Sequence, residues 1–137
     1  MKISPPRPLA LIVEDSPDLC RIYGLLLSHK DFELHFCCSA EEAYTSYCEF
    51  SDRINLIITD GQMSGESGVW LAHQVRSHSK NVPIVFISGM VKSYCATHCE
   101  GLFSGILEKP FKIEDFTEMI ETVMTASCEK VNSVECN

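Results

Sequence analysis

Five polar side chains stand at the ends of apolar runs in this chain. Glu14 and Asp15 follow the run at residues 9–13, Asp60 follows "LIIT", Ser88 follows the run at 84–87, and Lys109 comes after "GILE". Three carboxylates close together repel one another but suit a hard divalent cation such as Mg²⁺. Lys109 adds a fixed positive charge and Ser88 a hydroxyl. This set fits in-line attack by the Asp60 carboxylate on a phosphoryl group whose oxygens the cation, ammonium and hydroxyl neutralise and orient.

Strand and helix patterns alternate along the chain and would position these groups. Apolar runs predict strands at residues 8–13, 32–36, 54–59, 82–88 and 104–108. Helical periodicity and capping residues predict a helix after each strand, including a short one at 91–99 and a last one that begins near Ile113. Strict alternation implies an α/β fold, a parallel sheet with helices on both faces. The carboxyl ends of such strands line a crevice, so the five side chains should meet there.

The helix starts and inward faces are also predicted. Ser16 and Pro17 suit the N-cap and first turn of the first helix, and Ser39 with Glu42 suits a capping box for a helix that ends near Phe50. The inward faces should comprise Leu19, Ile22, Tyr23 and Leu26 in the first helix, Gly68, Leu71, Ala72 and Val75 in the third, and Phe116, Ile120 and Val123 in the last. The polar end from Ala126 onward is interpreted as a frayed terminus or linker stub.

Composition excludes several classes of protein. The 137 residues are one domain's worth, and 45% hydrophobic with 22% charged residues is typical of an ordinary globular chain. A formal net charge of −8 disfavours binding to nucleic acid, since a phosphate backbone attracts a basic surface. The apolar runs are too short to cross a bilayer, and no secretory-type segment follows the first residues, so a cytoplasmic location without membrane contact is expected.

The eight cysteines are expected to be reduced and mostly structural, because no secretory context favours a disulfide framework. Cys95, His98 and Cys99 could place soft ligands on one helical face. They have no second pair at zinc-finger spacing, which disfavours a metal role there.

The chain closely resembles the receiver domain of two-component response regulators over nearly its whole length. The matching pieces are "VEDS" at 13–16, "TDGQMSGESG" at 59–68, "ISGM" at 87–90 and "EKPF" at 108–111, each at the end of a predicted strand. The resemblance implies a flavodoxin-like, doubly wound sheet with strand order 2-1-3-4-5. The expected divisions are an N-terminal leader at 1–7, a receiver domain at 8–126 and a tail or linker stub at 127–137.

The resemblance also implies roles for individual residues. Glu14, Asp15, Asp60 and the Gln62 backbone carbonyl would hold Mg²⁺, and Asp60 would accept a phosphoryl group from a phosphohistidine. The donor would be a separate histidine kinase or histidine phosphotransfer protein. Ser88 would be the switch hydroxyl and Lys109 the phosphate-binding lysine, followed by Pro110, in the family often through a cis bond. The output would be protein contact through residues 91–99, 104–108 and the last helix.

Two positions depart from the family's pattern. Ser64 stands where a proline usually follows the methionine. Ile106 stands three positions before the lysine, where the family commonly has an aromatic residue that rotates inward when the hydroxyl moves to the phosphate. Phe103 and Tyr94 are nearby aromatics, but neither matches that position. The relay from the phosphorylated site to the output face is therefore expected to differ from the usual one.

Other functions fit less well. A flavodoxin-type FMN carrier would need a Ser/Thr/Gly-rich loop after the first strand, where this chain has "EDSPD". A phosphatase of the haloacid dehalogenase type has a DxD pattern, whereas "GQ" follows Asp60. A non-phosphorylated docking module, and a receiver from a hybrid histidine kinase acting as a phosphate shuttle, stay open alternatives. Beyond transfer to and from its own aspartate, no enzymatic activity is expected.

Overall fold

Five parallel strands form one sheet in the computed structural model, which describes residues 7–61, 67–89 and 101–135, with side chains through residue 127. The strands are β1 (Leu9–Val13), β2 (Glu33–Cys37), β3 (Ile54–Asp60), β4 (Ile84–Ser88) and β5 (Gly105–Glu108). Their order is β2-β1-β3-β4-β5, and every neighbouring pair is parallel. The predicted fold class and strand order are confirmed.

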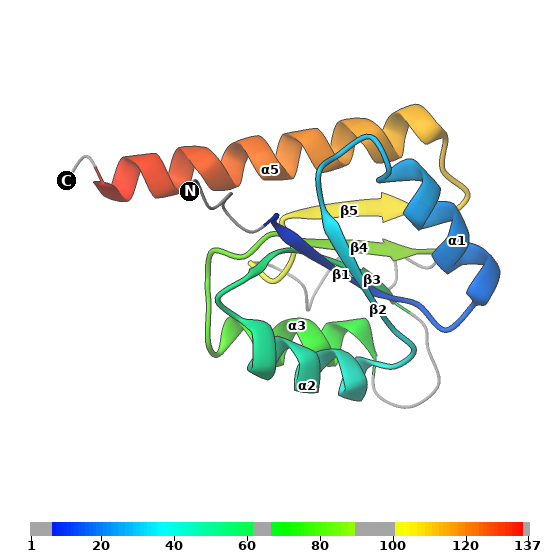
Figure 1. Ribbon diagram of the computed structural model, residues 1–137, viewed down its shortest axis with the longest axis horizontal. Coiled ribbons are helices and arrows are strands. Elements are labelled where there is room, and N and C mark those ends of the chain that lie inside the picture. The colour runs from blue at the N-terminus through cyan, green and yellow to red at the C-terminus, as the bar shows by residue number, and fades with distance from the viewer. Residues whose placement is uncertain (1–6, 62–66, 90–100, 136–137) are drawn as a thin grey trace, which may run out of the picture.

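Helices cover both faces of the sheet (Figure 1). In the described ranges they are α1 (Pro17–Leu26), α2 (Ala40–Phe50), α3 (Gly68–Arg76) and α5 (Ile113–Glu135). The helices α1 and α5 lie on one face, and α2 and α3 lie on the other. The helix predicted at 91–99 falls outside the described residues. None of the helices described is long and apolar enough to span a membrane.

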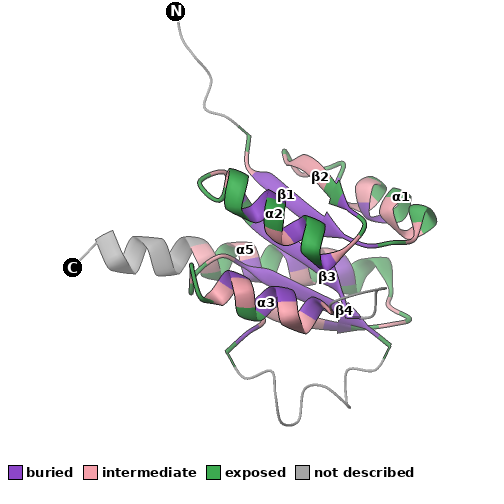
Figure 2. Cartoon of the chain, turned by 90° about the horizontal axis from the view of Figure 1, so that it is seen from below, coloured by how far each residue is buried: buried purple, intermediate pink, exposed green. Residues whose placement is uncertain are grey.

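Two apolar clusters fill the space between the sheet and its helices. Every residue of β1 and β4 is buried, as strands covered on both faces require, which explains their continuous apolar runs (Figure 2). The cluster under α2 and α3 includes Leu11, Ile57, Tyr47, Leu71 and Val75. The cluster under α1 and α5 includes Ile12, Ile58, Tyr23, Phe116 and Ile120. Alternate residues of each central strand therefore hold opposite layers together.

Side-chain caps begin the first two helices. The Leu19 amide donates to Ser16 Oγ at 3.4 Å, and the Glu42 amide donates to Ser39 Oγ at 3.1 Å, so both predicted N-caps are confirmed. The other half of the predicted capping box, a bond from the Ser39 amide to the Glu42 carboxylate, is wrong. The Glu42 carboxylate accepts from the Cys38 amide at 3.1 Å, one residue before the cap, instead of from the Ser39 amide.

One residue of the predicted inward face of α1 points outward. Tyr23 is 1% exposed and Leu19 and Leu26 pack against the core, whereas Ile22 is 44% exposed. Successive helical residues are rotated by about 100°, so a face centred near Tyr23 leaves Ile22 at its edge. The prediction for Ile22 is wrong for this reason.

The last helix is longer than predicted. α5 continues through Glu135, so the interpretation of residues from Ala126 onward as a frayed end is wrong for the backbone up to that point. Residues 126–135 contain neither Gly nor Pro, so nothing in them interrupts a helix that is already formed.

The attachment of α5 to the sheet depends on Phe116. Its ring is 1% exposed, and its centroid lies 5.8 Å from that of Tyr23 and 5.8 Å from that of Phe111. We expect Phe116→Ala to lower the free energy of unfolding by about 3–5 kcal/mol, because it leaves a cavity between α1 and α5. Urea denaturation measures this loss. The control Ile113→Ala, at a 63% exposed position on the same helix, should change the free energy of unfolding by no more than about 0.5 kcal/mol. Equal losses in the two variants would contradict the role of Phe116 in attaching α5.

Candidate functional site

Four of the predicted side chains meet at the carboxyl edge of the sheet. Asp60 ends β3 and Ser88 ends β4, while Glu14 and Lys109 directly follow β1 and β5. The Lys109 ammonium lies 3.1 Å from Asp60 Oδ2 and 3.8 Å from Glu14 Oε1. Glu14, Asp60 and Ser88 are 1%, 8% and 1% exposed. Two carboxylates therefore share one ammonium in a largely buried site.

The backbone around Glu14 is held from two sides. The Glu14 amide donates to the Cys37 carbonyl at 3.0 Å, and the Cys20 thiol donates to the Glu14 carbonyl at 3.4 Å. The Ser16 amide, at the start of α1, donates to Glu14 Oε2 at 3.2 Å. The other carboxylate oxygen, Oε1, is buried without a hydrogen-bond donor from the described part of the chain.

This environment changes the acidity of Glu14. Its pKa rises from the usual 4.5 to about 7, first because burial disfavours the charged form and then because of the nearby Asp60 carboxylate. The Ser16 amide and the Lys109 ammonium act in the opposite direction but only in part. When both carboxylates are ionised, the site therefore carries more negative charge than the Lys109 ammonium neutralises.

Small residues let other groups approach the backbone of Asp60. A Cβ on Gly68 would lie 2.5 Å from the Asp60 carbonyl oxygen, so only glycine lets the start of α3 pack there. The Thr59 hydroxyl donates to that same carbonyl at 3.1 Å. The Gly61 amide donates to the Ile87 carbonyl at 3.0 Å, and a Cβ on Gly61 would lie 3.0 Å from Ser88 Cβ. The sequence predicts Gly68 on the inward face of its helix, but it assigns none of these three residues a role beside Asp60, although both glycines stand in "TDGQMSGESG".

The loop after β5 is tied to β4. The Lys109 amide donates to the Ser88 carbonyl at 3.0 Å, which fixes the lysine backbone beside Asp60. The Lys109–Pro110 peptide bond is cis, as the family resemblance implied.

The donor set fits a hard cation. Mg²⁺ is usually held by one or two carboxylates and keeps several water molecules. Glu14 and Asp60 supply two such groups, and Glu14 Oε1 is a buried acceptor that receives no hydrogen bond from the described residues. Asp15 is exposed, and Gln62 lies outside the described residues. Within the described ranges, no three His, Cys, Asp or Glu side chains are arranged as a metal cluster.

The cysteine predictions are tested in part. Cys20, Cys37, Cys38 and Cys48 are free thiols, as expected for these four. The possible ligands Cys95, His98 and Cys99 lie outside the described residues.

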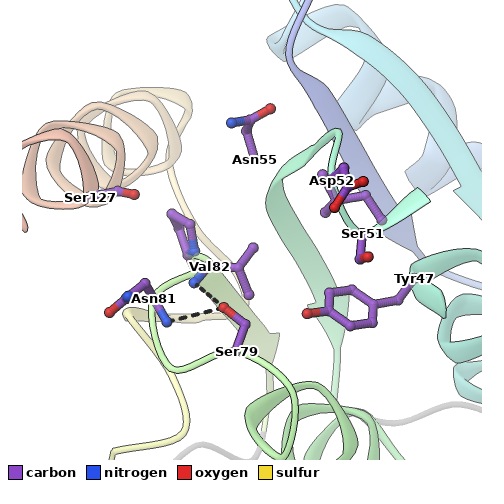
Figure 3. Close-up of a pocket in the computed structure, with 10 residues that line it drawn as sticks. Tyr47, Ser51, Asp52, Asn55, Ser79, Asn81, Val82 and Ser127 are labelled. Atoms are coloured by element: carbon purple, nitrogen blue, oxygen red, sulfur yellow. Dashed lines mark hydrogen bonds between the residues drawn. The ribbon is translucent and has the colours of Figure 1, made fainter. Parts of the chain in front are cut away.

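A polar pocket of about 350 Å³ lies at the opposite, amino-terminal edge of the sheet (Figure 3). It is lined by residues near the end of α2, the starts of β3 and β4, and α5. Its Ser79 hydroxyl accepts from the Asn81 and Val82 amides, both at 3.3 Å, so this group stabilises its own loop. The pocket contains none of the four converging side chains.

Comparisons with known proteins show the family and the fold of the chain. The family model "Response regulator receiver domain" matches residues 10–121, so the chain belongs to this family. It is 30% identical over 108 residues to the uncharacterized transcriptional regulatory protein YrkP of Bacillus subtilis (strain 168), which covers 77% of this chain and 44% of that protein. It is 28% identical over 83 residues to a two-component response regulator-like protein of Oryza sativa subsp. indica, covering 58% of this chain and 11% of that one.

Solved structures share the fold. A response regulator receiver domain protein from Clostridium thermocellum superimposes with a TM-score of 0.79 at 18% identity, covering 87% of this chain and 95% of that one. The response regulator TrrA from Thermotoga maritima, solved in complex with Mg(2+)-BeF, gives a TM-score of 0.75 at 22% identity, with coverage of 85% and 98%. The chain spans less than half the length of the curated relatives described above.

The raised pKa of Glu14 predicts how stability depends on pH. Between pH 4.5 and about 7 the folded chain keeps a proton that the unfolded chain releases, so this group's contribution to stability falls as the pH rises. We expect Glu14→Gln, which mimics the protonated acid, to match the native chain below pH 4.5. Above pH 7 it should be more stable by up to about 3 kcal/mol. Urea denaturation in EDTA from pH 4 to 8 measures the free energy of unfolding of both proteins. If the two free energies changed with pH in the same way, the raised pKa of Glu14 would be contradicted.

Proposed function

We propose that this chain is a phosphoacceptor receiver domain of a two-component signalling system, phosphorylated on Asp60 by the phosphohistidine of a histidine kinase or histidine phosphotransfer protein. The observation that carries the proposal is the contact of 3.1 Å between the Lys109 ammonium and the Asp60 carboxylate, beside the buried Glu14. The receiver domain would occupy residues 8–126 and act in the cytoplasm.

In the transfer step, an Asp60 carboxylate oxygen attacks the phosphorus atom. The new oxygen–phosphorus bond forms as the bond from phosphorus to the histidine nitrogen breaks, and the imidazole keeps the electron pair and takes a proton. Lys109 neutralises charge on the phosphoryl oxygens, as fixed ammonium groups do in phosphoryl transfer. Ser88, whose β-carbon lies beside Gly61, supplies a hydroxyl to another phosphoryl oxygen and acts as the switch.

Four groups would hold the cation: the carboxylates of Glu14, Asp15 and Asp60, and the backbone carbonyl of Gln62. When bound, Mg²⁺ draws charge from the phosphoryl oxygens and so favours attack by a carboxylate. The buried Oε1 of Glu14, which accepts no hydrogen bond from the described residues and lies 3.8 Å from the Lys109 ammonium, supports this assignment.

Phosphorylation would shift the population toward a conformation that a downstream protein prefers. The output face would be the region of residues 91–99, β5 and α5, and nucleic acid or membrane contact is not part of the proposal. The chain's only chemistry would be gain and loss of its own phosphoryl group.

Acetyl phosphate with Mg²⁺ should phosphorylate the native chain. Intact mass spectrometry is expected to show a gain of one phosphoryl group, which is lost on Asp60→Asn because the nucleophile is removed and lost on adding EDTA because the cation is removed.

The matched control is Asp52→Asn, an exposed aspartate at the opposite edge of the sheet. It should gain the same mass as the native chain. A native-like gain in Asp60→Asn would overturn the assignment, and no gain in the native chain together with no binding of Mg²⁺ would favour a constitutive docking module.

Magnesium should stabilise the fold without any phosphodonor. A ligand that binds only the folded state at 100 times its dissociation constant adds about 2.7 kcal/mol, which corresponds to several degrees in melting temperature for a domain of this size. We expect this rise at pH 8 in the native chain and in Asp52→Asn, and a much smaller one in Asp60→Asn. Differential scanning calorimetry with and without MgCl₂ measures it; equal rises in all three proteins would contradict a site at Asp60.

A further inference from the structure

The residue after Asp60 has no side chain, and an aromatic ring fills the space beside it. A Cβ placed on Gly61 would lie 2.5 Å from Phe86 Cζ and 2.8 Å from Phe86 Cε2. Phe86 is completely buried in β4. Its ring therefore rests directly against the backbone that follows the proposed phosphoacceptor, at closer range than any other residue type at position 61 would allow.

A second ring lies on the first. The ring centroids of Phe86 and Phe103 are 4.3 Å apart and their planes differ by 19°, the tightest of the aromatic pairs among the described residues. Stacked rings of this kind contribute about 0.5–1.5 kcal/mol beyond the area they bury. The two rings therefore pack as one unit.

The segment that carries Phe103 is attached to α3 on one side of that residue and to β4 on the other. Arg76, at the end of α3, donates from Nε to the Leu102 carbonyl at 3.0 Å. The Ser104 amide donates to the Ile84 carbonyl at 2.8 Å, and the Ile84 amide donates to Ser104 Oγ at 3.1 Å. Phe103 thus moves with the start of β5 and is not a loose loop side chain.

The same stack lies beside the position where the family's usual aromatic residue is missing. In the pairing of β4 with β5, Phe86 is directly opposite Ile106. Ile106 is aliphatic, so the usual ring is missing there. Phe86 instead places a ring opposite this position on the neighbouring strand β4, and Phe103 places another three residues before it in the sequence.

We propose that the Phe86–Phe103 stack couples the backbone beside Asp60 to residues 102–108, in place of an aromatic residue at position 106. Movement of Gly61 would displace the Phe86 ring, and the Phe103 ring would carry that displacement to the start of β5. Chains of packed side chains with few alternative arrangements can carry such coupling. The use of this path in signalling rests on the proposed phosphorylation of Asp60, whereas the mechanical contact does not.

The contact is tested first without any phosphodonor. Gly61→Ala forces a methyl group against Phe86, so ¹³Cα chemical shifts of residues 102–108 should change relative to the native chain. In a Phe103→Leu background the same substitution should change those shifts by less than half as much, as a double-mutant cycle measures. Gly89→Ala is the matched control, because a Cβ there meets no atom of the described residues within 4 Å. Equal changes with and without Phe103, or equal changes from Gly89→Ala, would overturn the proposal.

The second test uses beryllofluoride and Mg²⁺ as a phosphoryl mimic on the native chain, Phe103→Leu and Phe111→Leu. Phe111 belongs to the Tyr23–Phe116 stack on the other face of the sheet, so its variant controls for loss of a ring. We expect the mimic to change chemical shifts next to Asp60 in all three proteins. The changes at residues 102–108 should be less than half of the native ones in Phe103→Leu only. A full response at 102–108 in that variant would overturn the coupling. No change next to Asp60 in the native chain would overturn the proposed phosphorylation. The double-mutant cycle of Gly61→Ala with Phe103→Leu would then be the test of the mechanical contact.

Discussion

Two buried carboxylates, on Glu14 and Asp60, share the single ammonium group of Lys109 at the carboxyl edge of the sheet. Removing charges from water is costly, and one lysine leaves an excess of negative charge, which is why the pKa of Glu14 is raised to about 7. Under the proposed function, a bound cation would relieve this excess of charge. The unliganded chain would then give up some stability in exchange for affinity toward positive charge and for a reactive carboxylate.

The strand order of the sheet positions these side chains. β1, β3, β4 and β5 end at one edge, so four side chains far apart in the sequence converge there. Close approaches at two glycines tighten the edge further, with the start of α3 against the Asp60 carbonyl at Gly68 and the Phe86 ring against Gly61. The proposed path from Asp60 toward β5 runs through this same packing.

The α/β class and the converging residues were predictable because strands buried on both faces read as continuous apolar runs, and a polar residue that interrupts such a run stands out. Features set by tertiary packing were not predictable. The outward turn of Ile22 depends on where the core lies around α1, the reach of Glu42 to the Cys38 amide depends on the loop before the helix, and the stack of Phe86 on Phe103 joins residues of different elements. The length of α5 does not follow from composition, because a polar end is typical of fraying, while residues 126–135 contain no Gly or Pro to stop the helix.

The most direct test of the central claim locates the phosphoryl group chemically. An aspartyl phosphate is reduced by borohydride to homoserine, which peptide mass spectrometry assigns to a single position. After treatment of the native chain with acetyl phosphate and Mg²⁺, the account predicts homoserine at position 60 and at no other aspartate. Homoserine at Asp15, Asp52 or any other position, with Asp60 unchanged, would contradict it.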